Sequence, residues 1–254
     1  MSGTIDLNAD LGEGFGPWRL TDDEGLMPLL SSANIAAGGH ASDPATMRAT
    51  VRLAVRNRVR IGAHPGFPDK VGFGRRRLPY TPDEVTEMVA AQTGALIAVA
   101  ALEGGRVDYV KAHGALGNWS SEDEGICRAV LAGARAALGP EARLMAIAGT
   151  AQQRVCEAEG APHDLEVFLD RAYTNEGLLA PRGTPGAVLT DADEAADRMV
   201  AFLKSGAMPT VDGGEVRMRA ESICVHGDTP GAVAAARLCR ERLEGAGWRI
   251  AALS

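Results

Sequence analysis

Four of the five histidines occupy the same kind of position: each follows a short apolar run and adjoins a glycine or a proline. They are His40, His64, His113 and His226. Histidine titrates near neutral pH and is therefore suited to proton transfer, and its neutral ring is a common metal ligand. One histidine after a strand is ordinarily a loop residue or a satisfied hydrogen-bonding group. Four in one position predict a shared site.

Carboxylates, amides and cations occur at equivalent positions. Lys111, one of only three lysines, follows an apolar run that ends at Val110. Lysine and arginine can neutralise anionic substrates, and carboxylates can transfer protons. The other candidate residues are Asn8, Asp10 and Glu13 near the N-terminus, Asn34, Arg75, Arg76 and Asn118 further along, and Asp170, Arg171 and Tyr173 after a later apolar run.

Short apolar runs alternate with longer amphipathic segments along the chain, which predicts parallel strands covered by helices. The predicted strands are Thr4–Asn8, Ala33–Ala37, Val59–Ala63, Tyr109–Lys111, Arg143–Ile147, Glu166–Leu169, Ser222–Val225 and Arg249–Ala252. The predicted helices are Asp43–Arg58, Thr81–Leu102, Ser121–Leu138, Thr150–Gly160, Asp191–Ser205 and Thr229–Gly245.

The distribution of polar residues over many strand ends favours a closed sheet. An open parallel sheet usually forms its site at one switch point, whereas a barrel draws functional side chains from the ends of several strands. We therefore predict an α/β barrel that comprises residues 1–254 as one domain. In it, Lys111 and His113 point into the mouth, a cation beside a base.

Composition excludes several classes of function. The net charge is −7 and the sequence pI is near 5.3, which argues against binding to nucleic acid or to a membrane surface. There is no GxxxxGK[ST] motif and therefore no P-loop. The four cysteines have no CxxC spacing, which predicts reduced structural thiols and a cytoplasmic protein.

Six ordered segments resemble the LamB/YcsF family, which includes the A subunit of the prokaryotic 5-oxoprolinase. The segments are DLNADLGEGFG at 6–16, SANIAAGGHASDP at 32–44, IGAHPGFPDKVGFGRR at 61–76, YVKAHGALGN at 109–118, EVFLDRAYTNEGLLAPR at 166–182 and ICVHGDTPGAV at 223–233. The resemblance implies a distorted TIM-like barrel, similar to the glycoside hydrolase/deacetylase group. It also implies ATP-dependent opening of 5-oxo-L-proline to L-glutamate, together with subunits B and C.

This chemistry suggests a role for each candidate. We expect Lys111, Arg75 and Arg76 to neutralise phosphate or carboxylate charge, and His64, His113 and Asp170 to transfer protons. The amides of Asn8, Asn34 and Asn118 are expected to orient the lactam, and Asp10 or Glu13 to hold Mg²⁺ with ATP. Asp10 is also a candidate catalytic residue, and His40, Arg171, Tyr173 and His226 complete the expected substrate site.

The sequence departs from the family pattern at five positions. The family commonly has Cys-Gly-Phe-His at 37–40, glycine at 42, Lys-Pro-His at 111–113 and tyrosine at 117. This chain has Ala37, Gly39, Ser42, Ala112 and Gly117 there. The smaller residues are expected to open space near His40 and Asn118 and to alter substrate preference.

Two alternative functions fit the same residues. In the first, Asp10, His40, His64, His113 and Asp170 bind Zn²⁺ or another divalent metal and hydrolyse an amide or acetyl group without ATP. In the second, the chain is a non-catalytic subunit that delivers a lactam or a carbohydrate to a partner enzyme, and ATP binds largely on that partner.

Overall fold

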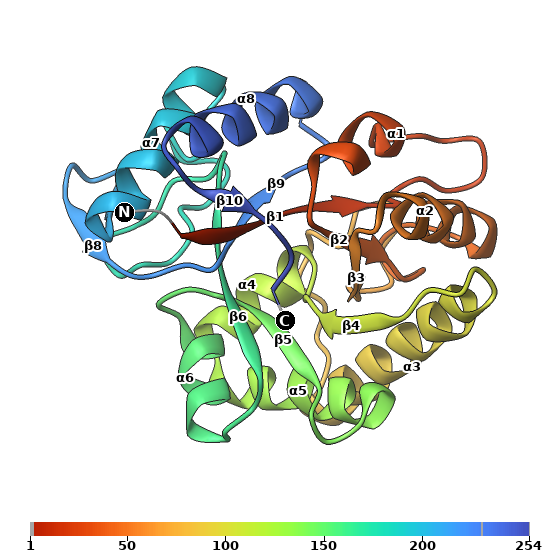
Figure 1. The fold of residues 1–254 in the computed structure, drawn as a ribbon. Coiled ribbons are helices and arrows are strands. Elements are labelled where there is room, and N and C mark those ends of the chain that lie inside the picture. The colour runs from red at the N-terminus through yellow and green to blue at the C-terminus, as the bar shows by residue number, and fades with distance from the viewer. Residues whose placement is uncertain (1–2, 230, 254) are drawn as a thin grey trace.

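Seven parallel strands close into a barrel in the computed structural model, which describes residues 3–229 and 231–253 (Figure 1). Strand β1 pairs with β2 on one side and with β9 on the other, and this closes the ring. A regular TIM barrel has eight strands, so this barrel is a distorted relative. The barrel strands are β1 (Thr4–Leu11), β2 (Ser32–Ala36), β3 (Arg60–His64), β4 (Val107–Val110), β5 (Arg143–Ile147), β6 (His163–Phe168) and β9 (Ser222–Val225).

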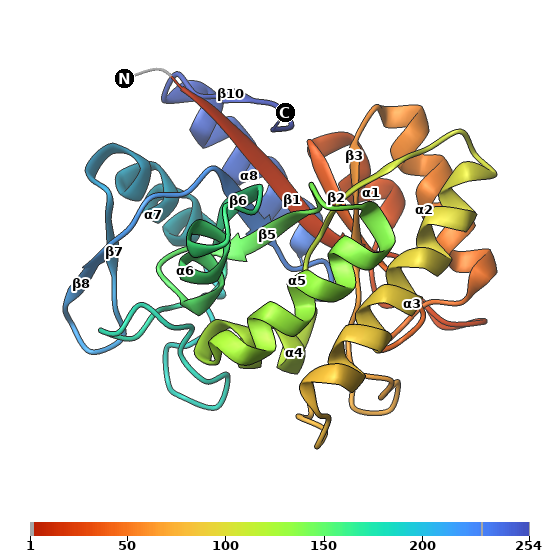
Figure 2. The ribbon, with the colours of Figure 1, turned by 90° about the horizontal axis from the view of Figure 1, so that it is seen from below.

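Helices surround the barrel (Figures 1 and 2). In Figure 2 both chain termini lie at one end of the molecule, and α4 lies towards the other end. The helices are α1 (Asp23–Leu26), the 3₁₀ helix η1 (Met27–Leu29), α2 (Pro44–Asn57), α3 (Pro82–Ala101), α4 (Gly114–Glu122), α5 (Glu124–Leu138), α6 (Ala151–Ala158), α7 (Ala192–Ser205) and α8 (Ala232–Gly245).

Strand β1 shows how the sequence gives the barrel a polar interior. Its apolar residues Ile5, Leu7, Ala9 and Leu11 are fully buried in the hydrophobic core. The residues between them are polar and meet side chains from other barrel strands; Asn8, for example, contacts Glu166 of β6. Successive side chains of a strand point to opposite faces. One face of β1 therefore packs under the helices while the other lines the barrel.

Two helix starts that the sequence predicted are confirmed by their caps. The Asp43 carboxylate accepts hydrogen bonds from the backbone of Ala45 and Thr46, with Pro44 in the first turn of α2. Thr81 and Glu84 form a reciprocal capping box at the start of α3. Such caps satisfy backbone N–H groups that the first helical turn leaves unpaired.

The predicted helix Ser121–Leu138 is wrong at its start. Helix α4 ends at Glu122, and Asp123 adopts an extended conformation and caps a separate helix, α5. Helix α4 itself begins directly after His113, because Gly114 adopts a φ of 52° that allows the sharp turn out of the strand end. None of the predicted helices begins at this glycine, so α4 was missed.

Other differences concern short elements. Strands β7 (Ala207–Pro209) and β8 (Glu215–Arg217) form an antiparallel hairpin that was not predicted, because three-residue strands give almost no periodic signal. Strand β10 covers only Arg249–Ile250 of the predicted Arg249–Ala252 and pairs with the start of β1. Helices α1 and η1 were also missed. The predicted helix Thr229–Gly245 includes Pro230, which lies outside the described residues; α8 begins at Ala232.

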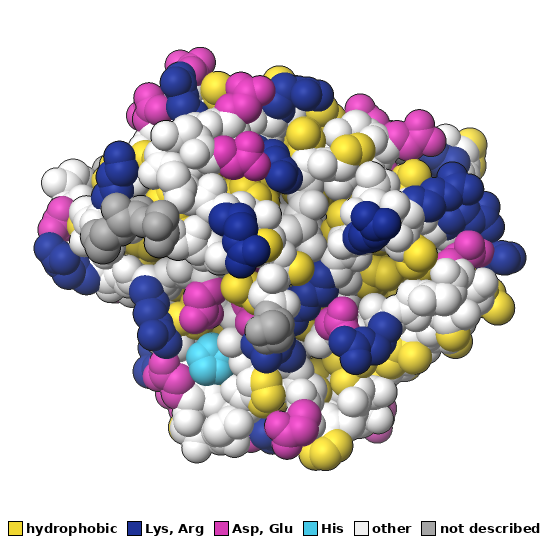
Figure 3. All heavy atoms as spheres, viewed as in Figure 1, with side chains coloured by type: hydrophobic (Ala, Val, Ile, Leu, Met, Phe, Trp, Pro, Cys, Tyr) yellow, Lys and Arg dark blue, Asp and Glu magenta, His cyan; other side chains and the backbone are white. Residues whose placement is uncertain are grey.

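The structure describes the features behind the expectations about membranes, nucleic acid and cysteines. No helix within residues 3–229 and 231–253 is long and apolar enough to cross a bilayer. On the face that carries the termini, acidic and basic side chains are interspersed (Figure 3). All four cysteines are free and buried, namely Cys127, Cys156, Cys224 and Cys239.

Candidate active site

A cavity of about 380 Å³ lies at the carboxyl ends of the barrel strands. Its lining combines the ends of strands with the loops and helices that follow them, so distant parts of the chain share one opening, as the barrel prediction requires. Among the predicted site residues, those that line it are Asp10, Glu13, His64, Arg75, Lys111, His113, Asn118, Arg171 and His226.

Lys111 is the centre of a buried ionic cluster. Its side chain is almost fully buried, and its Nζ lies 3.0 Å from Asp10 Oδ1 and 3.0 Å from Glu166 Oε2. Burial alone would lower the pKa of Lys111, but the carboxylates of Asp10 and Glu166 hold it well above its ordinary value. Lys111 is therefore a fixed cation in the floor of the cavity.

Asp10 stands at the end of β1 between Lys111 and His64. Its Oδ1 accepts from Lys111 and from Asn34 Nδ2 at 2.9 Å, and its Oδ2 lies 3.4 Å from His64 Nε2. Burial would raise the pKa of Asp10, yet His64 and Lys111 lower it well below its ordinary value. The Asp10 carboxylate is therefore ionised and has a fixed orientation.

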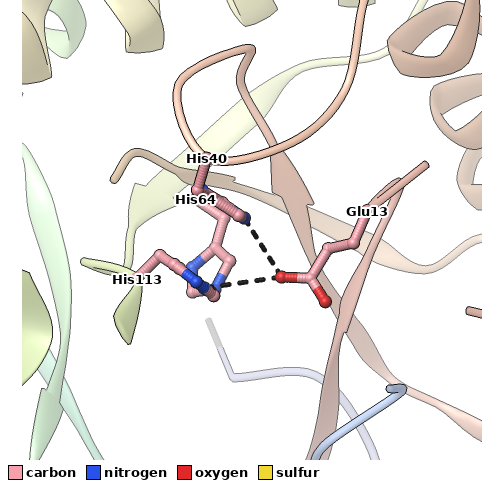
Figure 4. Close-up of side chains that lie close together, drawn as sticks. All are labelled: Glu13, His40, His64 and His113. Carbon is pink, nitrogen blue, oxygen red and sulfur yellow. Dashed lines mark hydrogen bonds and ion pairs between the residues drawn. The ribbon is translucent and has the colours of Figure 1, made fainter. Parts of the chain in front are cut away.

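Three histidines and Glu13 gather beside this cluster (Figure 4). His40 Nε2 lies 3.1 Å and His113 Nδ1 lies 3.4 Å from Glu13 Oε1, and the rings of His40 and His113 stack with centroids 3.5 Å apart. Burial lowers the pKa of His40 and of His113 well below the ordinary value. Burial and the nearby charge of Asp10 raise the pKa of Glu13.

His226 reaches the cavity from the end of β9 and is held by Asp170. Its Nδ1 lies 2.7 Å from Asp170 Oδ1, and its ring stacks on Phe168. Thr229 Oγ1 donates to the other oxygen of Asp170. Asp170 itself does not line the cavity. The structure therefore places this candidate proton-transfer residue behind His226, where it orients the imidazole.

We expect Asp170→Asn to destabilise the protein most at neutral pH. Burial raises the pKa of Asp170, but His226 overcomes this effect and the pKa is lowered below 3.8. A carboxyl group whose pKa is lower in the folded than in the unfolded protein stabilises the fold at pH values above the unfolded-state pKa. This stabilisation is lost as the pH falls through the folded-state pKa. Losing the charged hydrogen bond should cost about 1.5–3 kcal/mol near neutral pH. Urea unfolding over a pH series measures this, and a cost that stays constant down to acid pH would contradict it.

Several other predicted residues support the site without lining the cavity. Asn8 donates to Ser222 and Glu166, and Asn34 bridges Asn8 and Asp10, so both amides are used within the barrel. The buried hydroxyl of Tyr173 accepts the backbone N–H of Phe168. His40 lies behind His113. Direct substrate contacts by these four candidates remain predictions.

The predicted arginines occupy different environments. Arg75 lines the cavity and pairs with Asp228 at 2.7 Å, whereas Arg76 pairs with Asp69 and its side chain is 63% exposed. Arg171 lines the cavity but donates to the carbonyl oxygens of Ala180 and Ala187. Burial lowers the pKa of Arg171 to about 10, so it stays charged at neutral pH.

Sequence reasoning missed four charged residues that line the cavity, Glu122, Glu166, Arg182 and Asp228. Glu166 was interpreted as part of a buried strand, although a carboxylate within an apolar run is itself a signal of a buried partner. Arg182 was included in a family segment but was not singled out. Asp228 directly precedes the predicted helix Thr229–Gly245 and was not among the candidates.

Comparison with known proteins agrees with this geometry. The sequence pattern described as the LamB/YcsF family matches residues 5–254. The chain belongs to the LamB/YcsF family. Curated members similar to it are the 5-oxoprolinase A subunits of Azorhizobium caulinodans, 49% identical over 98% of each chain, and of Streptomyces avermitilis, 49% identical over 98% of this chain and 100% of that one. The crystal structure of the lactam utilization protein from Thermus thermophilus superimposes with a TM-score of 0.92 at 42% identity, covering 98% of this chain and 100% of that chain.

One departure from the LamB/YcsF pattern, Gly39, does not open space as expected, whereas Ala112 and Gly117 line the cavity. A side-chain carbon at Gly39 would collide with the carbonyl oxygen of Gly66 and the amide of Gln92. A side-chain carbon at Gly117 would lie 2.6 Å from the carbonyl oxygen of Ala112. Neighbouring atoms already occupy the space at Gly39, so the expectation of extra room beside His40 is wrong, while that of room near Asn118 stays a prediction. Ser42 adopts a φ of 76°, which explains why the family favours glycine there.

Proposed function

We propose that this chain is the A subunit of a 5-oxoprolinase and that, together with subunits B and C, it opens 5-oxo-L-proline to L-glutamate as ATP is hydrolysed. The observation that carries the proposal is the buried Lys111 ammonium, which is fixed by Asp10 and Glu166 in the floor of a polar cavity. The names of the relatives, which refer to 5-oxoprolinase and to lactam utilization, support the same substrate class.

The charges around the cavity suit a small anionic substrate. Arg75, Arg171 and Arg182 line its wall, and arginine forms bidentate contacts with carboxylate and phosphate groups. The volume of about 380 Å³ is within the range of small-molecule sites. We expect the carboxylate of 5-oxoproline to bind at these arginines while its lactam faces Lys111.

The reaction needs help because the lactam is a resonance-stabilised amide. ATP phosphorylates the carbonyl oxygen and leaves as ADP, which turns this oxygen into part of a leaving group. Water then adds its hydroxyl to the carbonyl carbon, the ring C–N bond breaks and the ring nitrogen takes up a proton, which leaves an acyl phosphate. A second water hydrolyses the acyl phosphate to the carboxylate of glutamate and free phosphate. Lys111 stabilises charge on the oxygen, His64 and His113 transfer the protons, and Asn118 orients the amide.

ATP enters the proposal as a co-substrate, with Mg²⁺. The predicted magnesium ligands Asp10 and Glu13 do not fit this ion as they stand. Mg²⁺ requires an octahedral shell of oxygen atoms, whereas Glu13 Oε1 faces imidazole nitrogens and Asp10 faces Lys111 and His64. We therefore assign no step to Mg²⁺ at these residues and expect the nucleotide to be bound largely by the B and C subunits.

A reconstituted assay tests the proposal. The purified A, B and C subunits are mixed with 5-oxoproline and ATP, each is omitted in turn, and glutamate and ADP are followed together. We expect glutamate only from the complete mixture. Glutamate from B and C alone would make this chain a delivery protein, and glutamate from this chain alone without ATP would make it an independent amidase; either result overturns the proposal.

Arg75→Ala and Arg76→Ala form a matched pair of variants. Arg75 lines the cavity, so its loss should lower kcat/KM for 5-oxoproline by about 10- to 10²-fold, which corresponds to one or two charged hydrogen bonds. Arg76 pairs with Asp69 outside the cavity, and its loss should change kcat/KM by less than about threefold. Equal effects in the complete assay would contradict this assignment.

A further inference from the structure

The hydrogen bonds of His64 and His113 fix which nitrogen carries the hydrogen when a ring holds only one. His64 Nδ1 lies 2.8 Å from the carbonyl oxygen of Lys111, and His113 Nε2 lies 2.8 Å from that of Phe73. A carbonyl oxygen only accepts, so both of these ring nitrogens must carry hydrogen. The other nitrogens, His64 Nε2 and His113 Nδ1, therefore present lone pairs, and they face each other at 3.0 Å. Two acceptors at this distance repel unless a cation lies between them.

Glu13 completes a set of ligand atoms around this point. Its Oε1 lies 3.4 Å from His113 Nδ1, and the potential ligand atoms of Glu13, His40, His64 and His113 all lie within 4.8 Å of one another. Zinc bonds of about 2.0–2.1 Å in a tetrahedral site imply ligand–ligand separations of about 3.3–3.4 Å. The separations of 3.0 and 3.4 Å are close to this value.

The stacking geometry excludes His40 from direct binding beside His113. The planes of the two rings are parallel within 5° at a centroid distance of 3.5 Å, so a metal in the plane of one ring cannot lie in the plane of the other. The rings of His64 and His113 are 88° apart and can share one ion. His40 Nε2 instead contacts Glu13 and holds the carboxylate from behind (Figure 4).

We propose that His64 Nε2, His113 Nδ1 and Glu13 bind a divalent first-row transition metal such as Zn²⁺. Metal-binding histidines almost always donate their second ring N–H to a carbonyl or a carboxylate, as both rings do here. This site differs from the zinc site considered in the sequence analysis, which included Asp170; that residue lies behind His226.

The site is open towards the substrate cavity. Glu13, His64 and His113 all line the cavity, whereas His40 does not. Three protein ligands leave a position for water or for a substrate oxygen, as in catalytic metal sites. A metal there would polarise the lactam carbonyl or activate water, and His64 and His113 would then serve as its ligands in place of the proton transfer proposed above. All of the ligands come from this one chain, so metal binding requires neither ATP nor the B and C subunits.

Metal binding by the isolated chain tests the inference. The protein is dialysed against EDTA and titrated with Zn²⁺ by calorimetry and with Co²⁺ by visible absorption, where nitrogen-containing sites of low symmetry give intense ligand-field bands. We expect about one equivalent of either ion to bind, with nanomolar to micromolar affinity. If the protein takes up neither ion, a proton lies between the two nitrogens and the proposal is overturned.

Five single variants assign the ligands. We expect His64→Gln, His113→Gln and Glu13→Gln each to weaken binding by more than about 10²-fold, and His40→Gln by about 10-fold, as for a residue that orients a ligand. His163→Gln is the control, since His163 starts β6 and contacts the carbonyl of Ala161. Circular dichroism establishes that each variant is folded. If folded His113→Gln or Glu13→Gln binds the metal with the parental affinity, the site is refuted. If His40→Gln binds the metal as weakly as His113→Gln does, the assignment of the ligands is refuted.

Discussion

Replacing Lys111 with methionine is expected to lower ATP-dependent glutamate release by about 10²–10³-fold when subunits B and C are present. Lys111 supplies the only ammonium among the side chains that line the described cavity, and it is fixed before substrate binds by Asp10 and Glu166. Methionine retains much of the length of the side chain and removes the charge. The measurement is the steady-state rate of glutamate and ADP formation in the complete mixture.

Lys111→Met leaves the buried carboxylates of Asp10 and Glu166 without their cation. The loss of stability must therefore be measured separately from the loss of activity. Breaking a buried ion pair by removing one partner costs about 3–5 kcal/mol. The double variant Lys111→Met/Glu166→Gln removes one of the stranded charges and should recover part of that stability without recovering activity. Lys204→Met, at an exposed position on α7, is the matched control. Parental activity in folded Lys111→Met would exclude Lys111 from the mechanism.

The barrel and the location of the cavity were predictable because each depends on a local pattern. The alternation of Asp6, Asn8 and Asp10 with apolar residues follows from the two-residue period of a strand. The position of His64 and His113 after apolar runs follows from the rule that sites of parallel sheets lie beyond the carboxyl ends of strands. These two patterns placed both histidines and Lys111 at one opening without any knowledge of distances.

Which side chains contact one another within the site was not predictable, because these contacts depend on how deeply each residue lies in the barrel and on how the histidine rings are oriented. Glu166 lies in the middle of an apolar run and meets Lys111 only across the closed barrel. Arg75 and Arg76 are neighbours in the sequence, yet one lines the cavity and the other does not. Whether His40 binds directly or through Glu13 is decided by ring planes, for which one sequence contains no signal.

Along the polar face of β1, residues near the cavity serve the proposed function, and residues deeper in the barrel stabilise the fold. Asp10 lies at the cavity, Asn8 lies beneath it, and Asp6 lies deepest, where it is fully buried. Ser31 and Ser32 donate to Asp6 Oδ1 at 2.6 and 2.7 Å, and Ser222 donates to Oδ2. These serines stand immediately before or at the start of β2 and at the start of β9, the two strands that pair with β1. Asp6 therefore ties together the strands that close the barrel.

Asp6→Ala is accordingly expected to lower the free energy of unfolding by about 3–5 kcal/mol. It leaves three buried hydroxyl groups without their acceptor, and each unsatisfied group costs about 1–3 kcal/mol. The total is smaller than the sum because some of these hydroxyl groups find other partners. Asp6→Asn preserves the shape and an acceptor oxygen and should cost less. Asp212→Ala, in the exposed turn between β7 and β8, should leave stability within about 0.5 kcal/mol. Urea unfolding at neutral pH compares the three. Because Asp6 does not line the cavity, kcat of the folded fraction should stay near the parental value, and a loss of kcat without a loss of stability would assign Asp6 to the chemistry instead.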